Sequence, residues 1–524
     1  MSTNLQTPPP ASSSGRPKPK PGKHQSGSGV PPLNPEHKQT QGRSATLSDD
    51  SKNGSSKDGM KKTRDLPRGW RWATLPELGE LSRGKSKQRP RNDPKLYGGP
   101  YPFIQTGDIR ESGGKICRHT QTYSEAGLAQ SRLWPRGTLC ITIAANIGET
   151  GILTYPACFP DSVVGFRSEA DPITVSFVEL YFRIAKHDLE RYAPATAQKN
   201  INVAILSKLP IPVPPPAEQQ RIVAEIEKQF TRLDAGIAAL RRVHANLKRY
   251  RAAVLKAACE GRLVPTEAEL AKTAKRKSKF ETGEELLARI LIERRKNWQG
   301  RGQYKEPAAL NTAKLFHLPA GWSWTTLDAL AEIKGGVTKD QNRKHTAPAR
   351  SVPYLRVANV QRGYIDLTEV KEIVTTEEEI QELALKPGDI LFNEGGDRDK
   401  LGRGWIWNGE LPECIHQNHV FRARLYVAAL NPKLISWYAN TFGQKFFFDE
   451  GKHTTNLASI SMSKLKGLPV PIPPPAEQTR IVAEVERRLS VVEELESAVT
   501  VNRQRAIRLR QSILHKAFTG ELTA

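Results

Sequence analysis

A run of basic and amide side chains between Arg83 and Arg91 is the first place in this sequence where residue types suggest chemistry. Lys85, Lys87, Arg89 and Arg91 alternate there with Gly, Ser, Gln and Pro, without apolar periodicity. Lys and Arg bind phosphates, and Arg, Lys, Asn and Gln can hydrogen bond to base edges in a DNA groove. The run predicts a loop that contacts DNA, although a solvated charge run has the same composition.

A second set of groups with the same chemistry follows short apolar pairs. The pair Phe103-Ile104 precedes one group, and Tyr354-Leu355 precedes the other. Each apolar pair predicts the end of a strand, and the polar residues after it are expected to face the groove. A further basic group stands where the second half of the chain would repeat the basic loop of the first. The expected DNA contacts in these groups are Gln105, Thr106 and Arg110, then Arg356, Asn359, Gln361 and Arg362, and finally Lys339, Arg343 and Lys344.

Two small polar segments form the third set. Residues 196–200 include Gln198, Lys199 and Asn200, and residues 453–456 read His-Thr-Thr-Asn. Both precede segments that are expected to lead into long helices. Phosphate contact by Gln198, Lys199 and Asn200 is one hypothesis, and a turn or helix cap is the other.

The sequence predicts no catalytic or metal site. Cys414, His416 and His419 lack a fourth ligand at zinc spacing, so we expect them to serve in the core or on the surface. Gly402-Arg403-Gly404 lacks the Gly-Lys-Ser/Thr ending of a phosphate-binding loop. Asp93 and Lys95 lie in an expected loop with no second carboxylate on a strand. No Asn-Pro-Pro-aromatic element is present to position a target adenine.

Composition limits the class of protein. The 524 residues carry a formal net charge of +24, with 38% hydrophobic residues, which indicates folded domains with a polyanionic partner or simply a basic surface. The five cysteines are scattered, as in a reducing compartment. No apolar run is long enough for a membrane span. A cytoplasmic protein without membrane contact is the expectation.

The first 64 residues are rich in Pro, Ser, Gly and Lys and poor in large apolar side chains. Such a segment cannot bury enough surface to offset its loss of conformational entropy. We predict a disordered basic tail. Non-specific contact with DNA, added solubility and an origin in expression cloning all remain possible interpretations.

An internal repeat organises the rest of the chain. Leu66-Pro67-Arg68-Gly69-Trp70 recurs 252 residues later from Leu318, and the Pro-rich segment at 209–219 recurs 259 residues later from Leu468. Between these two motifs the halves share little sequence. A protein that recognises two different DNA sequences would need repeated motifs around dissimilar segments. Structural duplication alone would also produce this pattern.

Each Pro-rich segment predicts the start of a helix of about 40 residues. Apolar residues recur at intervals of seven, from Ile226 to Val254 and from Val485 to Ile513. Both seams become polar in their later turns, where Tyr250 and Leu509 are expected to replace part of the lost apolar contact. Pro at the helix start and Gly261 and Gly520 after the helix end are typical helix boundaries. Neither helix can bury its stripe alone, so the two are expected to pair antiparallel about a pseudo-two-fold axis.

The segment between the first long helix and the second half is charged, with helical spacing from Glu281 to Trp298. It is either a bridging helix or a docking element for another protein. The predicted organisation is a tail at 1–64, a globular unit at 65–210, a long helix at 211–262, a connecting segment at 263–316, a second globular unit at 317–468 and a second long helix at 469–524.

These motifs resemble the specificity (S) subunit of type I restriction-modification enzymes. The resemblance rests on the Leu-Pro-x-Gly-Trp-x-Trp opening and the Pro-Pro-Pro-Ala-Glu-Gln-x-Arg-Ile-Val-Ala-Glu helix start, each present twice, and it covers residues 66–524. It implies an α+β fold with two target-recognition domains separated by two long antiparallel helices. Each domain would read half of a split, asymmetric DNA sequence, and the helices would set the gap.

The resemblance also implies partners. They are double-stranded DNA, two modification subunits that methylate adenine with S-adenosylmethionine, and two restriction subunits that use ATP and Mg. The chain itself would hold no cofactor and would be a non-catalytic specificity subunit. The alternative from a different class is a coiled-coil scaffold whose globular units bind protein.

Overall fold

The computed structural model describes residues 66–87, 90, 92–144, 146–168, 171–192, 201–273, 279–298, 302–338, 347–396, 400–453 and 458–523. Contacts divide the chain between Lys62 and Thr63, so every described residue belongs to the second part. The predicted tail at 1–64 lies outside the described residues. In this part no helix is long and apolar enough to cross a membrane.

The first globular domain is built on a five-stranded sheet with the order β2-β8-β6-β7-β4. Its inner strands are buried along almost their whole length, and for this reason their sequences read as continuous apolar runs. Trp134 stacks on Phe159 beside this sheet, with ring centroids 5.0 Å apart. The elements are β1(Arg71–Ala73), α1(Leu75–Leu78), β2(Glu80–Arg83), η1(Pro94–Leu96), β3(Tyr97–Phe103), α2(Thr106–Glu111), β4(Lys115–Ile116), β5(Gln121–Tyr123), α3(Glu125–Ala129), β6(Leu139–Thr142), β7(Thr150–Leu153), β8(Val163–Arg167), α4(Pro172–Tyr192), α5(Val203–Ser207) and β9(Ile211–Val213).

The second domain repeats the plan with the sheet β11-β20-β16-β18 and a smaller sheet β15-β12-β19. Its elements are α7(Glu267–Thr273), α8(Gly283–Lys296), β10(Ser323–Thr326), α9(Leu327–Leu330), β11(Ala331–Lys334), β12(Ala349–Leu355), β13(Val360–Gln361), β14(Tyr364–Ile365), β15(Lys371–Thr376), α10(Glu377–Leu383), β16(Ile390–Asn393), β17(Gly395–Gly396), β18(Gly404–Ile406), β19(Ile415–His416), β20(Val420–Leu425), α11(Pro432–Thr441), α12(Gly443–Glu450), β21(Lys452–His453), β22(Ala458–Ser459), α13(Met462–Lys466) and β23(Pro469–Ile472).

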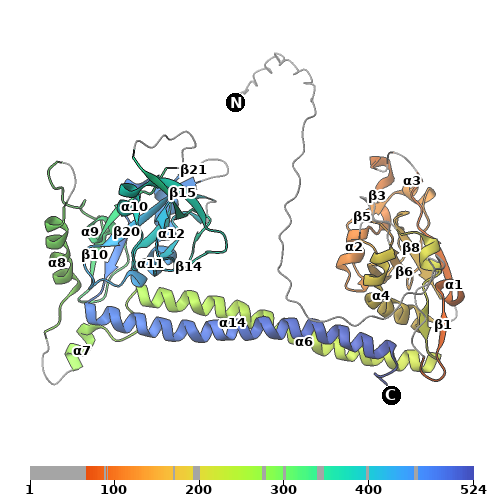
Figure 1. The fold of residues 1–524 in the computed structure, drawn as a ribbon. Helices are drawn as coiled ribbons and strands as arrows, with labels where there is room; N and C mark the ends of the chain where they lie inside the picture. The colour runs from red at the N-terminus through yellow and green to blue at the C-terminus, as the bar shows by residue number, and fades with distance from the viewer. Residues whose placement is uncertain are drawn as a thin grey trace, which may run out of the picture. The chain divides into compact units, whose positions relative to one another are not determined.

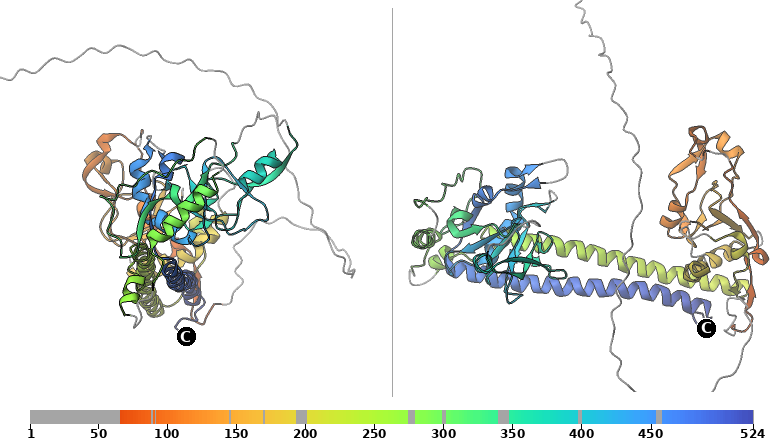
Figure 2. Two further views of the ribbon diagram at one scale, coloured as in Figure 1. Left: turned by 90° about the vertical axis from the view of Figure 1, so that its left-hand side faces the viewer. Right: turned by 45° about the horizontal axis from the view of Figure 1, so that its top comes forward.

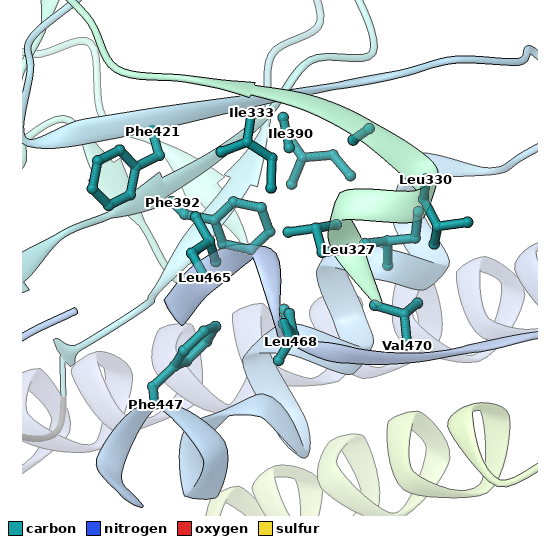
Figure 3. Packing of buried hydrophobic residues seen from close by; sticks show 14 of the residues in the cluster. Leu327, Leu330, Ile333, Ile390, Phe392, Phe421, Phe447, Leu465, Leu468 and Val470 are labelled. Carbon is teal, nitrogen blue, oxygen red and sulfur yellow. The ribbon is translucent and has the colours of Figure 1, made fainter. Parts of the chain in front are cut away.

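Helix α8, predicted as a bridge or a docking element, is part of the second domain. Leu286 and Ile290 are fully buried in the main core of that domain. Figure 3 shows other members of this core, among them Leu327, Phe392 and Leu468, gathered between the sheet and the helices. The apolar face of α8 is therefore covered by its own domain, because apolar burial removes that face from water.

A buried charge fixes the end of α8. The guanidinium group of Arg294 donates to the carboxylate of Asp328 at 2.9 Å, to Tyr304 Oη at 2.6 Å and to the carbonyl of Lys305 at 2.9 Å. A buried cation needs such partners, since desolvation without them is costly. The helix is thus locked to the domain by charge as well as by apolar packing.

The two repeated sequence motifs of each half contact each other. Strand β1 pairs antiparallel with β9, and β10 pairs in the same way with β23. Trp70 Nε1 donates to Glu218 at 3.1 Å, and Trp322 Nε1 donates to Glu477 at 2.9 Å. Burial raises the pKa of Glu477. Each half therefore closes its domain with a short sheet and a Trp–Glu hydrogen bond at the start of its long helix.

The long helices α6(Pro216–Cys259) and α14(Pro475–Phe518) each contain 44 residues, which confirms the two helices predicted from the seven-residue spacing. Both begin with Pro in the first turn. Gly261 and Gly520, just beyond the ends, have φ of 68° and 79°, and this left-handed conformation favours glycine.

The two helices pack side by side (Figures 1 and 2) through a seam that includes Leu240, Leu247, Val492 and Val499. Residue numbers increase in opposite directions along the two helices. Arg251 of α6 contacts Glu496 of α14 at 3.3 Å, whereas Asp234, earlier in α6, contacts Arg510, later in α14. The pair is antiparallel, and ion pairs occupy part of the polar seam.

One expectation about the seam was wrong. Tyr250 and Leu509 were expected to replace apolar contact in the polar turns, yet they remain 45% and 49% exposed. Ion pairs across the seam bury charged stems there instead, since a long Arg side chain can reach a carboxylate on the facing helix.

Both domains contact both helices. In the first domain, Lys115 pairs with Glu227 of α6 at 3.1 Å, and Phe177 packs on Phe518 of α14 with ring centroids 4.9 Å apart. In the second, Trp437 and Tyr438 of α11 share a core cluster with Val254 of α6 and Val485 of α14. Each helix thus starts at one domain and ends at the other.

Candidate nucleic-acid interface

Three loops meet at one end of the sheet in the first domain. The loop after β2 carries Lys85 and Lys87, which are exposed, and its Gly84 N–H donates to the carbonyl of Val163 at 2.9 Å. A Cβ at Gly84 would lie 2.3 Å from the carbonyl oxygen of Pro160, so only glycine allows this close crossing. Ile143, after β6, donates to Ser162 at 3.0 Å.

The third segment at this end is the one that returns toward the long helix. Ile201 N–H donates to the carbonyl of Ile143 at 3.0 Å. The predicted contacts Gln198, Lys199 and Asn200 immediately precede Ile201 but lie outside the described residues, as do Arg89 and Arg91. The described contacts bring the ends of both predicted segments to the same edge of the sheet.

The second domain repeats this junction. Val337, after β11, donates to His416 at 2.8 Å and accepts from Asn418 at 2.9 Å. Ile460 N–H donates to the carbonyl of Glu394, after β16, at 2.8 Å. Lys339, Arg343 and Lys344 and residues 454–457 lie outside the described residues. The loops that lead to them nevertheless start from the positions that Lys85 and Ile201 occupy in the first domain.

The polar groups after the apolar pairs also adopt equivalent turns. Gln105 N–H donates to the carboxylate of Asp108 at 2.8 Å, and Arg356 N–H donates to the side-chain oxygen of Asn359 at 2.9 Å. Both turns follow a strand that pairs in parallel with the segment before β8 or β20. Gln105 and Arg356 therefore occupy the same position in the two domains.

Asn359 corrects the predicted set of contacts. Its side chain is only 3% exposed, and Nδ2 donates to the carbonyls of Asp366 at 2.8 Å and Glu369 at 3.0 Å. With Oδ1 occupied by Arg356 N–H, its hydrogen-bonding groups are used within the loop. Asn359 shapes the turn and has no face to offer to a base.

The remaining predicted residues differ in what surrounds them. Gln105 Nε2 donates to Gln121 Oε1 at 2.5 Å, whereas the guanidinium of Arg356 lies 3.5 Å from the carboxylate of Glu369. Gln361 Nε2 donates to its own loop, at the carbonyl of Ala358. Thr106 is half-buried at the start of α2, and Arg110 is exposed, 3.6 Å from Glu111.

Arg362 lies away from this junction. It lines a cavity of about 500 Å³ with Trp405, Lys433 and Glu493, between the second domain and the long helices. Its position next to the helices separates it from the turn of Arg356, with which it was grouped by sequence.

A polar loop in the first domain was not predicted from the sequence. Residues 117–120, between β4 and β5, are all exposed and line a cavity of about 460 Å³ with Asp108 and Lys115. Arg118 and His119 stand there next to Gln121, the partner of Gln105, and His119 Nδ1 lies 3.0 Å from Tyr155 Oη. The available signal was an Arg-His-Thr-Gln run without apolar spacing beside a predicted groove residue.

The cysteine and histidines near residue 416 form no metal site. The described residues contain no group of three or more His, Cys, Asp or Glu that could hold a metal ion. Burial raises the pKa of Cys414 to about 12, and burial lowers the pKa of His416 to about 4, while its Nδ1 contacts the carbonyl of Val420 at 2.7 Å. His419 is exposed and pairs with Glu394. Cys414 and His416 are thus core residues, and His419 is a surface residue.

Comparison with known proteins fits this doubled, basic and polar junction. The protein-family model of the type I restriction modification DNA specificity domain matches residues 67–240. The EcoKI specificity subunit of Escherichia coli K12 is 25% identical over 476 residues, covering 88% of this chain and 90% of that protein. Over 88% of its length the chain is similar to type I specificity subunits.

A second specificity subunit is similar in sequence, and two solved structures share the fold. The StySPI specificity subunit of Salmonella potsdam is 24% identical over 88% of this chain and 90% of its own length. The HsdS subunit from Thermoanaerobacter tengcongensis has the same fold, with a TM-score of 0.51 at 17% identity over 88% of this chain and 99% of that one. A chain from a study of assembly and conformational transition in the type I R-M system gives a TM-score of 0.61 at 18% identity, over 88% and 100%.

Proposed function

We propose that this chain is a specificity subunit that reads a bipartite, asymmetric DNA sequence, with one half read by each globular domain. The observation that carries this proposal is the repeated junction at the sheet end. Gln105 and Arg356 sit on the same turn in the two domains, yet they present an amide and a guanidinium group. Different groups in one frame would read different bases, because amides and guanidinium groups prefer different base edges.

In this proposal the two domains are those predicted from sequence, with α8 of the predicted connecting segment added to the second domain, and the two antiparallel helices separate them about a pseudo-two-fold axis. A helix of 44 residues is roughly 66 Å long at about 1.5 Å per residue. Two readers on one duplex must be spaced in register with its turn of about 34 Å. A stiff pair of helices can hold that register, which supports their role as the spacer.

The complex would contain two modification subunits and two restriction subunits. The modification subunits would methylate adenine with S-adenosylmethionine, and the restriction subunits would cleave DNA with ATP and Mg. An apolar groove of about 700 Å³ on the helix pair, lined by Leu233, Ile237, Val243 and Leu509, supports a protein partner on the helices. The specificity subunit would direct these reactions without catalysing them, in the cytoplasm.

Within the described residues, the groups available for DNA would be the exposed Lys85, Lys87 and Arg110 and the half-buried Gln105 and Arg356. Gln198, Lys199, Asn200, Arg89, Arg91, Lys339, Arg343 and Lys344 remain predicted contacts. Lys and Arg would hold phosphates and set the register, while the amide and guanidinium groups on the two turns would read bases.

Binding by the chain together with its modification subunit tests the proposal. We expect tight binding to duplexes from the host genome that carry one split sequence, with loss of selectivity when either half is scrambled. Fluorescence anisotropy with competitor DNA would measure this. Equal affinity for scrambled duplexes, or full selectivity from one half alone, would instead support the alternative of a scaffold whose domains bind protein.

A further inference from the structure

The middle of the helix pair carries an uncompensated positive charge. Residues 235–250 of α6 contain Arg241, Arg242, Lys248 and Arg249 and no Asp or Glu. Residues 497–512 of α14 contain four arginines, again without an acidic residue. The antiparallel contacts Asp234–Arg510 and Arg251–Glu496 bracket both stretches, so the two stretches lie opposite each other.

Seven of these eight basic side chains have no acidic partner among the described residues. Arg510 alone is paired, with Asp234, and the seven others are exposed. The stretch is about 24 Å long at 1.5 Å per residue. Like charges this close repel one another, because the screening length at physiological salt is about 8 Å. The seven are Arg241, Arg242, Lys248, Arg249, Arg503, Arg505 and Arg508.

The two ends of the helix pair are different. There Lys228 pairs with Glu225, Lys256 with Glu260, and Arg487 with Glu484. The part of the pair between the residues in contact with the first domain and those in contact with the second therefore carries seven basic side chains that are unpaired among the described residues, and it contains no acidic residue.

The heptad spacing places part of this charge on the side that contacts the domains. Glu227, Asp234, Arg241, Lys248 and Leu255 follow one another at intervals of seven and so form one line along α6. Glu227 pairs with Lys115 of the first domain, and Leu255 lines the cavity beside Trp405 and Trp437 of the second. Arg241 and Lys248 therefore lie on that line, between the two domains.

Arg503 of α14 lies on the same side. It occupies the seam position seven residues before Arg510, which lines the cavity next to the first domain with Glu227 and Asp234. The apolar groove of the pair uses other positions, including Val243 and Leu509. Of the seven unpaired basic residues, Arg505 lines that groove, whereas Arg241, Lys248 and Arg503 do not.

We propose that Arg241, Lys248 and Arg503 bind the phosphates of the unread base pairs between the two half-sequences. This inference rests on the proposed function. It adds that the helices bind the DNA between the two half-sequences as well as set its length. DNA fits better than an acidic protein, since these three charges are on the domain side and do not line the apolar groove. The stretch matches roughly seven base pairs at about 3.4 Å each. Phosphate contact carries no sequence information and so suits unread DNA.

The test uses the full chain with its modification subunit and a duplex carrying the split sequence found by mapping. One duplex has ordinary phosphates in the gap, and the other has neutral methylphosphonate linkages there. The variant is R241Q/K248Q/R503Q. The matched control is K228Q/K256Q/R487Q, which removes three charges from the same helices at positions paired with acids.

We expect the neutral gap to weaken binding by the unsubstituted protein and by the control, but not by the R241Q/K248Q/R503Q variant. With about 0.9 lost from the salt slope per contact, this variant should show a slope smaller by about 2.7. Its thermal unfolding temperature should be unchanged or higher, because repulsion is removed.

Equal binding of both duplexes by the unsubstituted protein would overturn the inference while leaving the proposed function intact. So would a variant that binds DNA normally but no longer assembles with the modification subunit, since the charge would then serve a protein. Absence of any selective DNA binding would instead be a failure of the proposed function.

Discussion

The junctions at the sheet ends of the two domains share one backbone arrangement but differ in the side chains around it. In the first domain, Gln105 lies beside Gln121 and the exposed polar loop at residues 117–120. In the second, Arg356 is drawn toward Glu369, and the side chain that closes the turn is a buried Asn359 in place of the more exposed Asp108. The comparison teaches that the frame is fixed by backbone hydrogen bonds, while the chemistry offered to DNA changes with a few side chains.

The largest effect is expected from changing the distance between the junctions. Insertion of seven residues at facing positions of α6 and α14 lengthens the pair by about 10 Å. Binding to the original split sequence should fall toward the non-specific level, a loss of about 10³-fold or more. Duplexes with larger gaps should restore it, as an anisotropy series over gap length would measure. Full affinity for the original gap would mean that the junctions do not act together.

The turn residues should differ in their contribution to stability. Asn359→Ala leaves three partly buried backbone groups without the side chain that they contact and should cost about 3 kcal/mol. Asp108→Ala removes the carboxylate that accepts from the N–H of the N-cap residue Gln105 in a half-buried turn, and it should cost about 1 kcal/mol. Urea unfolding of the two variants compares them. Equal losses would contradict the distinction between a buried and an accessible turn.

The strand before each junction gives a pH-dependent comparison. His416 occupies the position of Phe159 in the first domain, and burial lowers its pKa to about 4 from an ordinary 6.5. The folded state therefore favours the neutral ring. Stability is full above pH 6.5 and is lost as the pH falls toward 4, by about 2 kcal/mol at pH 5.

His416→Phe gives the second domain the phenylalanine that the first domain has at Phe159. The substitution should remove the loss of folding stability between pH 6.5 and 5. Urea unfolding at pH 7 and at pH 5 measures it. A variant that loses as much stability on acidification as the unsubstituted chain would show that His416 is not the titrating group.

The smallest effect concerns DNA affinity at the second junction. Glu369→Gln removes the carboxylate beside Arg356 and should raise affinity several-fold, with a salt slope larger by about one contact. The control is Glu378→Gln, an exposed glutamate on α10 of the same domain. An equal change from both substitutions would mean that the affinity depends on the net charge of the domain and not on the carboxylate beside Arg356.

Much of the frame was predictable because it depends on spacing along the chain. The seven-residue repeat predicted α6 and α14, and the apolar pairs Phe103-Ile104 and Tyr354-Leu355 placed Gln105 and Arg356 in equivalent regions. Pro216 and Gly261 marked helix ends through their own backbone preferences.

What could not be predicted depends on burial, which arises only when distant segments pack. Asn359 and Arg356 are both candidate DNA contacts by sequence, but hydrogen bonds to the loop carbonyls of Asp366 and Glu369 give Asn359 a structural role. Leu286 and Ile290 gave a helical pattern without revealing that the second domain covers it. The unpaired charge of Arg241 and Arg503 becomes visible only when the antiparallel register places the two stretches opposite each other.

Mapping of methylated adenines by single-molecule sequencing tests the central claim most directly. The host would carry this chain with its modification subunit, and a parallel host would carry a chain with an exchanged second domain. The account predicts one split sequence with two dissimilar halves and a constant gap, of which the exchange alters one half only. A single continuous sequence, or an exchange that alters both halves or neither, would contradict it.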